Sequence, residues 1–133
     1  MKGESNLAQL IKGMAPSLNP GEYVFVTIKD RNKIDRIQTI CEFKEKEGIT
    51  IVIEKSKADD LELTYEYIAS WITLAIHSSL EAVGLTASFS TELAKYNISC
   101  NVISAYYHDH IFVDKKDSAR AVQILRDLSE NYK

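Results

Sequence analysis

The residues best suited to chemistry are two histidines that flank an aspartate in AYYHDHIFV, residues 105–113. Alternate residues of a strand point to one face, so His108 and His110 could share a metal ion if a strand continues through them. A catalytic zinc needs a third protein ligand, and His77 is the other histidine of the chain. The competing interpretation is a hairpin corner in which Asp109 bonds to nearby backbone N–H groups. We favour the corner, with no metal and no cofactor, and leave open a ligand or interface role for the histidines.

Two further sets of reactive side chains give weaker signals. His77, Ser78 and Ser79 lack the GxSxG elbow of a serine hydrolase, and adjacent strand residues point to opposite faces. Cys41 and Cys100 fit neither a CxxC motif nor a zinc spacing, which predicts small buried side chains in a reducing compartment. No catalytic residue is therefore predicted, and we do not expect an enzyme.

Length, composition and charge describe one compact domain or two small halves that share a core. The chain has 133 residues, of which 45% are hydrophobic and 26% charged, as in ordinary globular proteins. Its net charge of -3 is spread along the chain, so no basic block favours nucleic acid or an anionic membrane. The apolar stretch 68–76 is too short to span a bilayer, and residues 1–10 lack the apolar region of a signal peptide. These features predict a cytoplasmic protein with no nucleic-acid or membrane partner.

The first half of the chain is expected to be rich in strands. Asn6 with Gln9 resembles a capping box, and Gly13 and Pro16 should end the helix that follows. Residues 36–44 fit helical spacing and strand spacing about equally, and we favour a strand. The expected elements are a helix after residue 6, a turn at 19–22, strands at 23–29, 36–44 and 49–54, a loop at 30–33, and a brief helix over 56–62 capped by Ser56.

The second half reads as strand, helix, strand, strand, helix. The expected elements are a strand at 65–78, a helix from about Leu85 to Tyr96 closed by Asn97, strands at 99–107 and 110–113, and a last helix capped by Asp117 or Ser118. A two-residue corner implies antiparallel pairing around it, and helices in such a sheet usually cover one face. The other face would carry Tyr67, Trp71 and Tyr106, either as core between two halves or as a subunit interface.

The order of these elements and the words HSSLEAVGLTASFSTELAKYNISCNVISAYYHDHIFV, residues 77–113, resemble the ACT-domain superfamily. The chain is most similar to small stand-alone bacterial proteins built from two ACT-like halves, here 1–64 and 65–133. The second half resembles the ACT type of aspartate kinases and of the animal cytosolic arginine sensor, and PGEYVFVTI (20–28) and EKEGITIVIEK (45–55) resemble the partner half. The resemblance implies an α+β, ferredoxin-like βαββαβ fold with antiparallel sheets and helices on one face.

The resemblance also implies a ligand site in the loop between the first strand and the first helix. Gly84 matches the glycine at the start of that helix, although it could also simply relieve crowding. The free N–H groups of Leu85 and Thr86 would suit a ligand carboxylate, and Glu81 would meet an ammonium group. The first half has no equivalent motif, so a second site in the chain is not expected. The implied ligand-binding residues are Ser79, Glu81, Val83, Gly84, Leu85, Thr86, Val102, Ile103 and Ser104.

The function implied is a non-catalytic regulatory or sensing module that binds a small amino acid and pairs into a homodimer. The alternative is an ACT protein that only oligomerises or binds partners and has no ligand. A metal-dependent enzyme that uses His77, His108 and His110 is a third interpretation.

Overall fold

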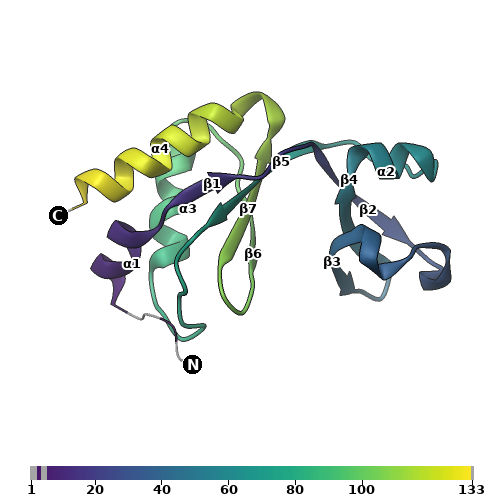
Figure 1. Ribbon diagram of the computed structural model, residues 1–133, viewed down its shortest axis with the longest axis horizontal. Coiled ribbons are helices and arrows are strands. Elements are labelled where there is room, and N and C mark those ends of the chain that lie inside the picture. The colour runs from purple at the N-terminus through teal and green to yellow at the C-terminus, as the bar shows by residue number, and fades with distance from the viewer. Residues whose placement is uncertain (1–2, 4–5, 133) are drawn as a thin grey trace. The chain divides into compact units, whose positions relative to one another are not determined.

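The computed structural model describes residue 3 and residues 6–132, which fall into two compact units (Figure 1). The smaller unit is Pro20–Ala69, and the larger unit consists of the described residues up to Asn19 and those from Ser70 onward. The first helix packs with the C-terminal part of the chain, and the division into family halves at 1–64 and 65–133 stays a prediction. Leu10 and Ile11 of this helix, together with Met14 directly after it, join the core of the larger unit.

In the smaller unit, strands β2 (Tyr23–Ile28), β3 (Thr39–Lys44) and β4 (Ile49–Glu54) form an antiparallel sheet. β4 lies in the middle, and the first residues of β5 (Ile68–Leu74) pair with β2. The helix α2 (Lys55–Asp60) contributes Ala58 to a core made by alternate strand residues, among them Val24, Val26, Ile51 and Ile53. The strands predicted at 23–29 and 49–54 are confirmed, and the ambiguous segment 36–44 is a strand from Thr39 onward.

Two predictions for this unit are wrong in detail. Ser56 does not cap α2, because the helix already begins at Lys55, with Glu54 at the N-cap and no side-chain cap bond. The segment 30–33, predicted as a loop, contains the 3-10 turn η1 (Arg31–Lys33), and the first residues of the strand predicted at 36–44 form a second 3-10 turn, η2 (Arg36–Gln38). Each turn is started by an aspartate whose carboxylate accepts a bond from the amide two residues on, from Asn32 and from Ile37 respectively.

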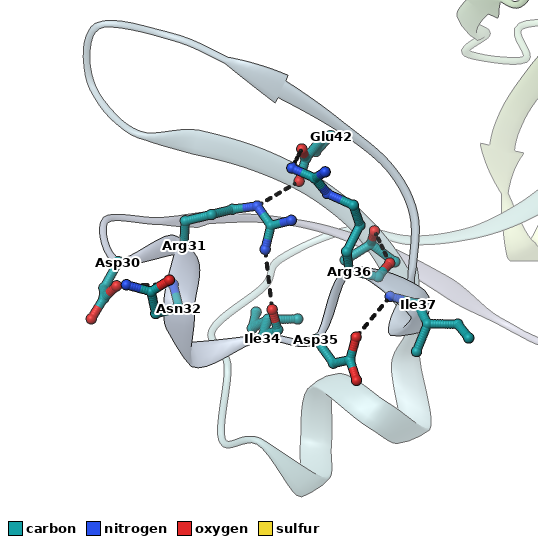
Figure 2. A network of polar contacts seen from close by, with 9 residues as sticks. Asp30, Arg31, Asn32, Ile34, Asp35, Arg36, Ile37 and Glu42 are labelled. Carbon is teal, nitrogen blue, oxygen red and sulfur yellow. Dashed lines mark hydrogen bonds and ion pairs between the residues drawn. The ribbon is translucent and has the colours of Figure 1, made fainter.

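An ion-pair network holds these turns against β3 (Figure 2). Glu42 of β3 accepts a hydrogen bond from Arg36 Nη2 at 3.0 Å, and it forms an ion pair with Arg31, whose Nε lies 3.0 Å from the carboxylate. Arg31 also donates through Nη1 to the carbonyl oxygen of Ile34 at 3.1 Å. One carboxylate therefore fixes both turns of the segment that connects β2 to β3.

Replacing Glu42 by glutamine should lower the free energy of unfolding by about 1–2 kcal/mol, because the change removes the charge that holds one hydrogen bond and one ion pair at a partly exposed site. Urea denaturation measures the loss, which should shrink at high salt. The exposed Glu47→Gln is the matched control for the charge change alone. Equal midpoints for the two variants would show that the network does not stabilise the fold.

The larger unit contains α1 (Leu7–Gly13), β1 (Pro16–Leu18), most of β5, α3 (Leu85–Lys95), β6 (Asn101–Ser104), β7 (Asp109–Asp114), η3 (Lys115–Asp117) and α4 (Ser118–Asn131). β5 lies between β1 and β7, and β6 pairs antiparallel with β7. The helices cover one face of these strands (Figure 1), where Phe89 and Leu125 pack against Ile72, Leu74 and Ile111. This is the predicted ferredoxin-like arrangement.

Several predicted element ends differ from the structure in this unit. β5 ends at Leu74 instead of continuing to 78, and the amide of Ala75 donates to the carbonyl of Ala15. β6 covers only 101–104, because the chain turns over 105–108, where the Ala105 amide donates to the His108 carbonyl at 3.1 Å. The predicted corner at residues 108 and 109 is therefore wrong, and Asp109 is the first residue of β7.

The helix boundaries agree better with their predicted caps. Asn6 caps α1 by accepting from the Gln9 amide at 3.1 Å, and Asn97 has the left-handed conformation after α3 with φ 60°. Asp117 occupies the N-cap position of α4 but makes no side-chain cap bond there. Among the described residues, no helix is both long enough and apolar enough to cross a bilayer.

Candidate functional site

A cavity of about 170 Å³ lies at the start of α3 in the larger unit. Its wall consists of the segment 78–87, without residues 81 and 83, together with Ser104 of β6 and Asp109 of β7. Five predicted ligand residues line it, namely Ser79, Gly84, Leu85, Thr86 and Ser104. Glu81 lines a neighbouring cavity of about 280 Å³ instead, Val83 is 82% exposed, and Val102 and Ile103 do not line either one.

The backbone at Gly84 gives this cavity its free amide groups. Gly84 has φ +98°, a left-handed conformation that favours glycine. The first intrahelical bond of α3 runs from the Ser88 amide to the Gly84 carbonyl at 2.9 Å. The amides of Leu85, Thr86 and Ala87 therefore have no partner within the helix. These N–H groups and the helix dipole make the wall of the cavity attractive to an anion.

Asp109 is the functional candidate that the sequence reasoning missed. The residue is 7% exposed and lines the cavity, while its backbone pairs with Ser104. Among residues 3 and 6–132, nothing forms a hydrogen bond or ion pair with the Asp109 carboxylate. The available signal was the alternation of Asp109 with Ile111 and Val113, both fully buried, which places the carboxylate on the inner face of the strand.

His108 and His110 make different hydrogen bonds. His108 Nδ1 lies 3.2 Å from the carbonyl oxygen of Ile76, so this nitrogen must carry a proton. His110 Nδ1 instead accepts from Trp71 Nε1 at 3.0 Å. The two imidazole centroids are 6.4 Å apart, and the part of the chain that is described contains no group of three His, Cys, Asp or Glu side chains suited to a metal.

The environments of the titratable side chains follow from burial and neighbouring charge. Burial lowers the pKa of His110, the charge of His108 lowers it further, and Asp109 acts in the opposite direction. Burial raises the pKa of the Cys100 thiol to about 11, so this cysteine is a poor nucleophile at neutral pH.

The lowered pKa of His110 predicts that the folded state loses stability in mild acid. The unfolded chain takes up a proton near pH 6.5 that the folded chain does not, so the free energy of unfolding falls as the pH drops below that value. Urea denaturation at pH 7.5 and pH 5.5 measures the difference. The free energy of unfolding should change less between these two pH values in His110→Asn, because asparagine keeps an acceptor for Trp71 but cannot titrate.

The three predicted interface residues occupy different environments. Trp71 is half-buried and stacks on Phe112 with centroids 6.2 Å apart. Tyr106 is 60% exposed and contacts the ring of Tyr107 at 5.0 Å. Tyr67 is half-buried in the smaller unit. Their role in a subunit interface stays a prediction.

Comparison with solved structures gives close and distant relatives of this fold. A protein of unknown function from Vibrio cholerae, described as a possible transport protein, is 44% identical over 92% of this chain and 95% of its own, with a TM-score of 0.84. An Agrobacterium tumefaciens protein is 14% identical over 87% of this chain and 89% of its own, with a TM-score of 0.66. The regulatory subunit of aspartate kinase from Thermus thermophilus is 8% identical over 87% of this chain and 98% of its own, with a TM-score of 0.60.

Family models identify both halves of the chain. Models described as ACT domain match residues 2–70 and residues 66–127, whereas no curated protein matches the chain. ACT domains are typically regulatory ligand-binding modules. Two matches in tandem, together with the ferredoxin-like topology and the aspartate kinase neighbours, show that the chain belongs to the ACT-domain family.

Proposed function

We propose that this protein is a regulatory module that binds a small amino acid in the cavity at the start of α3. The observation that carries the proposal is the Asp109 carboxylate, which is buried and unpartnered among the described residues in a cavity that also receives free helix amides. Burying a carboxylate without a partner is costly, so a cation that completes the site would be bound favourably.

The chemistry of the cavity matches an α-amino acid at both charged ends. The amides of Leu85, Thr86 and Ala87 suit the carboxylate, and Asp109 suits the ammonium group. Ser78, a residue that is 9% exposed and lines the same cavity, offers a hydroxyl as a further polar group. The volume of about 170 Å³ lies below the range of roughly 300–1,000 Å³ for drug-sized ligands, which favours a small ligand.

Isothermal titration calorimetry against the twenty L-amino acids tests this function, with protein first unfolded and refolded to remove any carried-over ligand. The amino acid that binds should lose most of its affinity when its amine is acetylated and, separately, when its carboxylate is converted to an amide. Complete absence of heat from all twenty would sink the ligand proposal. Affinity that survives both blocking groups would reject the two-ended recognition.

Replacing Gly84 by alanine should both weaken binding and destabilise the fold by about 1–2 kcal/mol. The backbone has φ +98°, and the added Cβ would lie 3.2 Å from Leu7 Cδ2. Gly21→Ala is the matched control, because Gly21 has φ +100° and its added Cβ would meet only ordinary contacts, 3.5 Å from the Tyr23 hydroxyl. Calorimetry should show weaker binding for the Gly84 variant only. The same loss of affinity in both variants would assign the effect to general destabilisation.

We also propose that two copies of the chain pair into a homodimer. ACT domains commonly oligomerise, and the outer edge of β6 in the larger unit has no paired strand among the described residues. Light scattering after gel filtration measures the mass directly. A dimer that binds none of the twenty amino acids would favour the alternative of a ligand-free ACT interaction protein.

A further inference from the structure

The ring of His110 is held in its neutral form by the groups that face Nδ1. Trp71 Nε1 lies 3.0 Å from this nitrogen and Thr73 Oγ1 lies 3.1 Å from it. An indole N–H can only donate, so Nδ1 carries the lone pair and the ring proton is on Nε2. Asn19 Nδ2 donates to Thr73 Oγ1 at 2.9 Å, which leaves the threonine proton free to point toward His110.

Protonation of His110 would break this arrangement. A proton on Nδ1 would turn the acceptor into a donor that faces the indole N–H, so Trp71 would have to separate from it. His108 does not share this constraint, since its Nδ1 faces the Ile76 carbonyl oxygen, which can only accept. The Nδ1 atoms of the two histidines therefore have opposite roles, an acceptor in His110 and a donor in His108.

His110 is also electrostatically coupled to the candidate site. Asp109 precedes it in β7 and points to the opposite face, into the cavity. His108 and Asp109 are the charged groups that act on His110. The groups that face it from β5, Trp71 and Thr73, and its partner Ile103 on β6 do not titrate in this range.

We propose that His110 makes amino-acid binding at the Asp109 cavity sensitive to acid. The inference rests on the proposed function and adds its regulation. A ligand ammonium group beside Asp109 and a proton on His110 repel each other, so each weakens the binding of the other by the same factor. Affinity is highest while His110 is neutral, and protonation lowers it while releasing Trp71.

The first experiment needs no ligand, because Trp71 is the single tryptophan of the chain. Its emission should pass through one transition below about pH 6.5 as the pH is lowered from 7.5 to 5.0. His110→Asn, whose amide oxygen can replace Nδ1 as the acceptor, should show no transition. In Asp109→Asn the transition should move to lower pH, because the carboxylate that favours the charged ring is gone.

The second experiment measures the affinity of each of the twenty L-amino acids by calorimetry at pH 7.5 and pH 5.5. The amino acid that binds should do so about fivefold or more weakly at pH 5.5. This loss should be absent in His110→Asn and retained in the control His108→Asn.

The outcomes separate this inference from the function on which it rests. Equal affinity at the two pH values, or a tryptophan transition that survives in His110→Asn, overturns the regulation and leaves amino-acid binding intact. Binding of none of the twenty at either pH removes the function and the regulation together. A pH effect that persists in His110→Asn would assign the titration to another group and also reject the inference.

Discussion

Replacing Phe89 by alanine is expected to lower the free energy of unfolding by about 3–5 kcal/mol, because it empties the centre of the core of the larger unit. Phe89 is 0% exposed and lies in the middle of α3, between Leu85 and Leu93, which are also buried. The truncation removes apolar contacts and leaves a void that a tightly packed core fills only in part. A loss of this size is comparable to the total stability of many domains.

The consequence for the site is as informative as the loss of stability. Leu85 and Phe89 anchor the first turns of α3, whose amides line the cavity. The variant should therefore bind amino acids less well even at temperatures where it remains folded. Thr91→Ala, at an exposed position of the same helix, is the control. Thermal unfolding followed by circular dichroism measures the midpoint temperature of both variants. If the midpoint falls as little in Phe89→Ala as in the control, the packing described for α3 is contradicted.

The fold was predictable where periodicity and capping agreed. The apolar spacing of Leu85, Phe89 and Leu93, closed by Asn97, marks a helix from both ends, and the structure has that helix. The strand ends were less predictable, because they depend on pairing partners far away in the sequence. β5 ends at Leu74, where the β1 register ends opposite Pro16, and no local feature of residues 75–78 announces this.

The candidate site also contains one residue with a local sequence signal and one whose role depends on distant strand pairing. The helix start at Gly84 carries a local signal, a glycine before a periodic apolar run, and this residue does line the cavity. The role of Asp109 depends on the register between β6 and β7, which sets which side of the strand faces the core. Placing the corner one or two residues too late left Asp109 in a turn, where its carboxylate was expected to bond to nearby backbone N–H groups instead of lining a cavity.

Replacing Asp109 by asparagine should weaken amino-acid binding by about thirtyfold or more, because the ligand ammonium group would lose its buried charged partner. The same change should leave the unliganded protein equally stable or more stable. Asp109 is 7% exposed, its carboxylate is unpartnered among the described residues, and an amide of the same shape has a smaller desolvation cost. Opposite effects on stability and on binding distinguish a functional side chain from a structural one.

Asp117→Asn is the matched control, since Asp117 is a buried aspartate of the same unit that has a partner. Its carboxylate lies 3.8 Å from Arg120 and outside the cavity, so its loss should slightly lower stability and leave binding unchanged. Urea denaturation gives the stability of each variant, and calorimetry gives its affinity for the amino acid. If Asp109→Asn instead destabilises the fold and binds as well as the parent protein, then the carboxylate is a structural group and the cavity at α3 is not where the charge of a ligand is recognised.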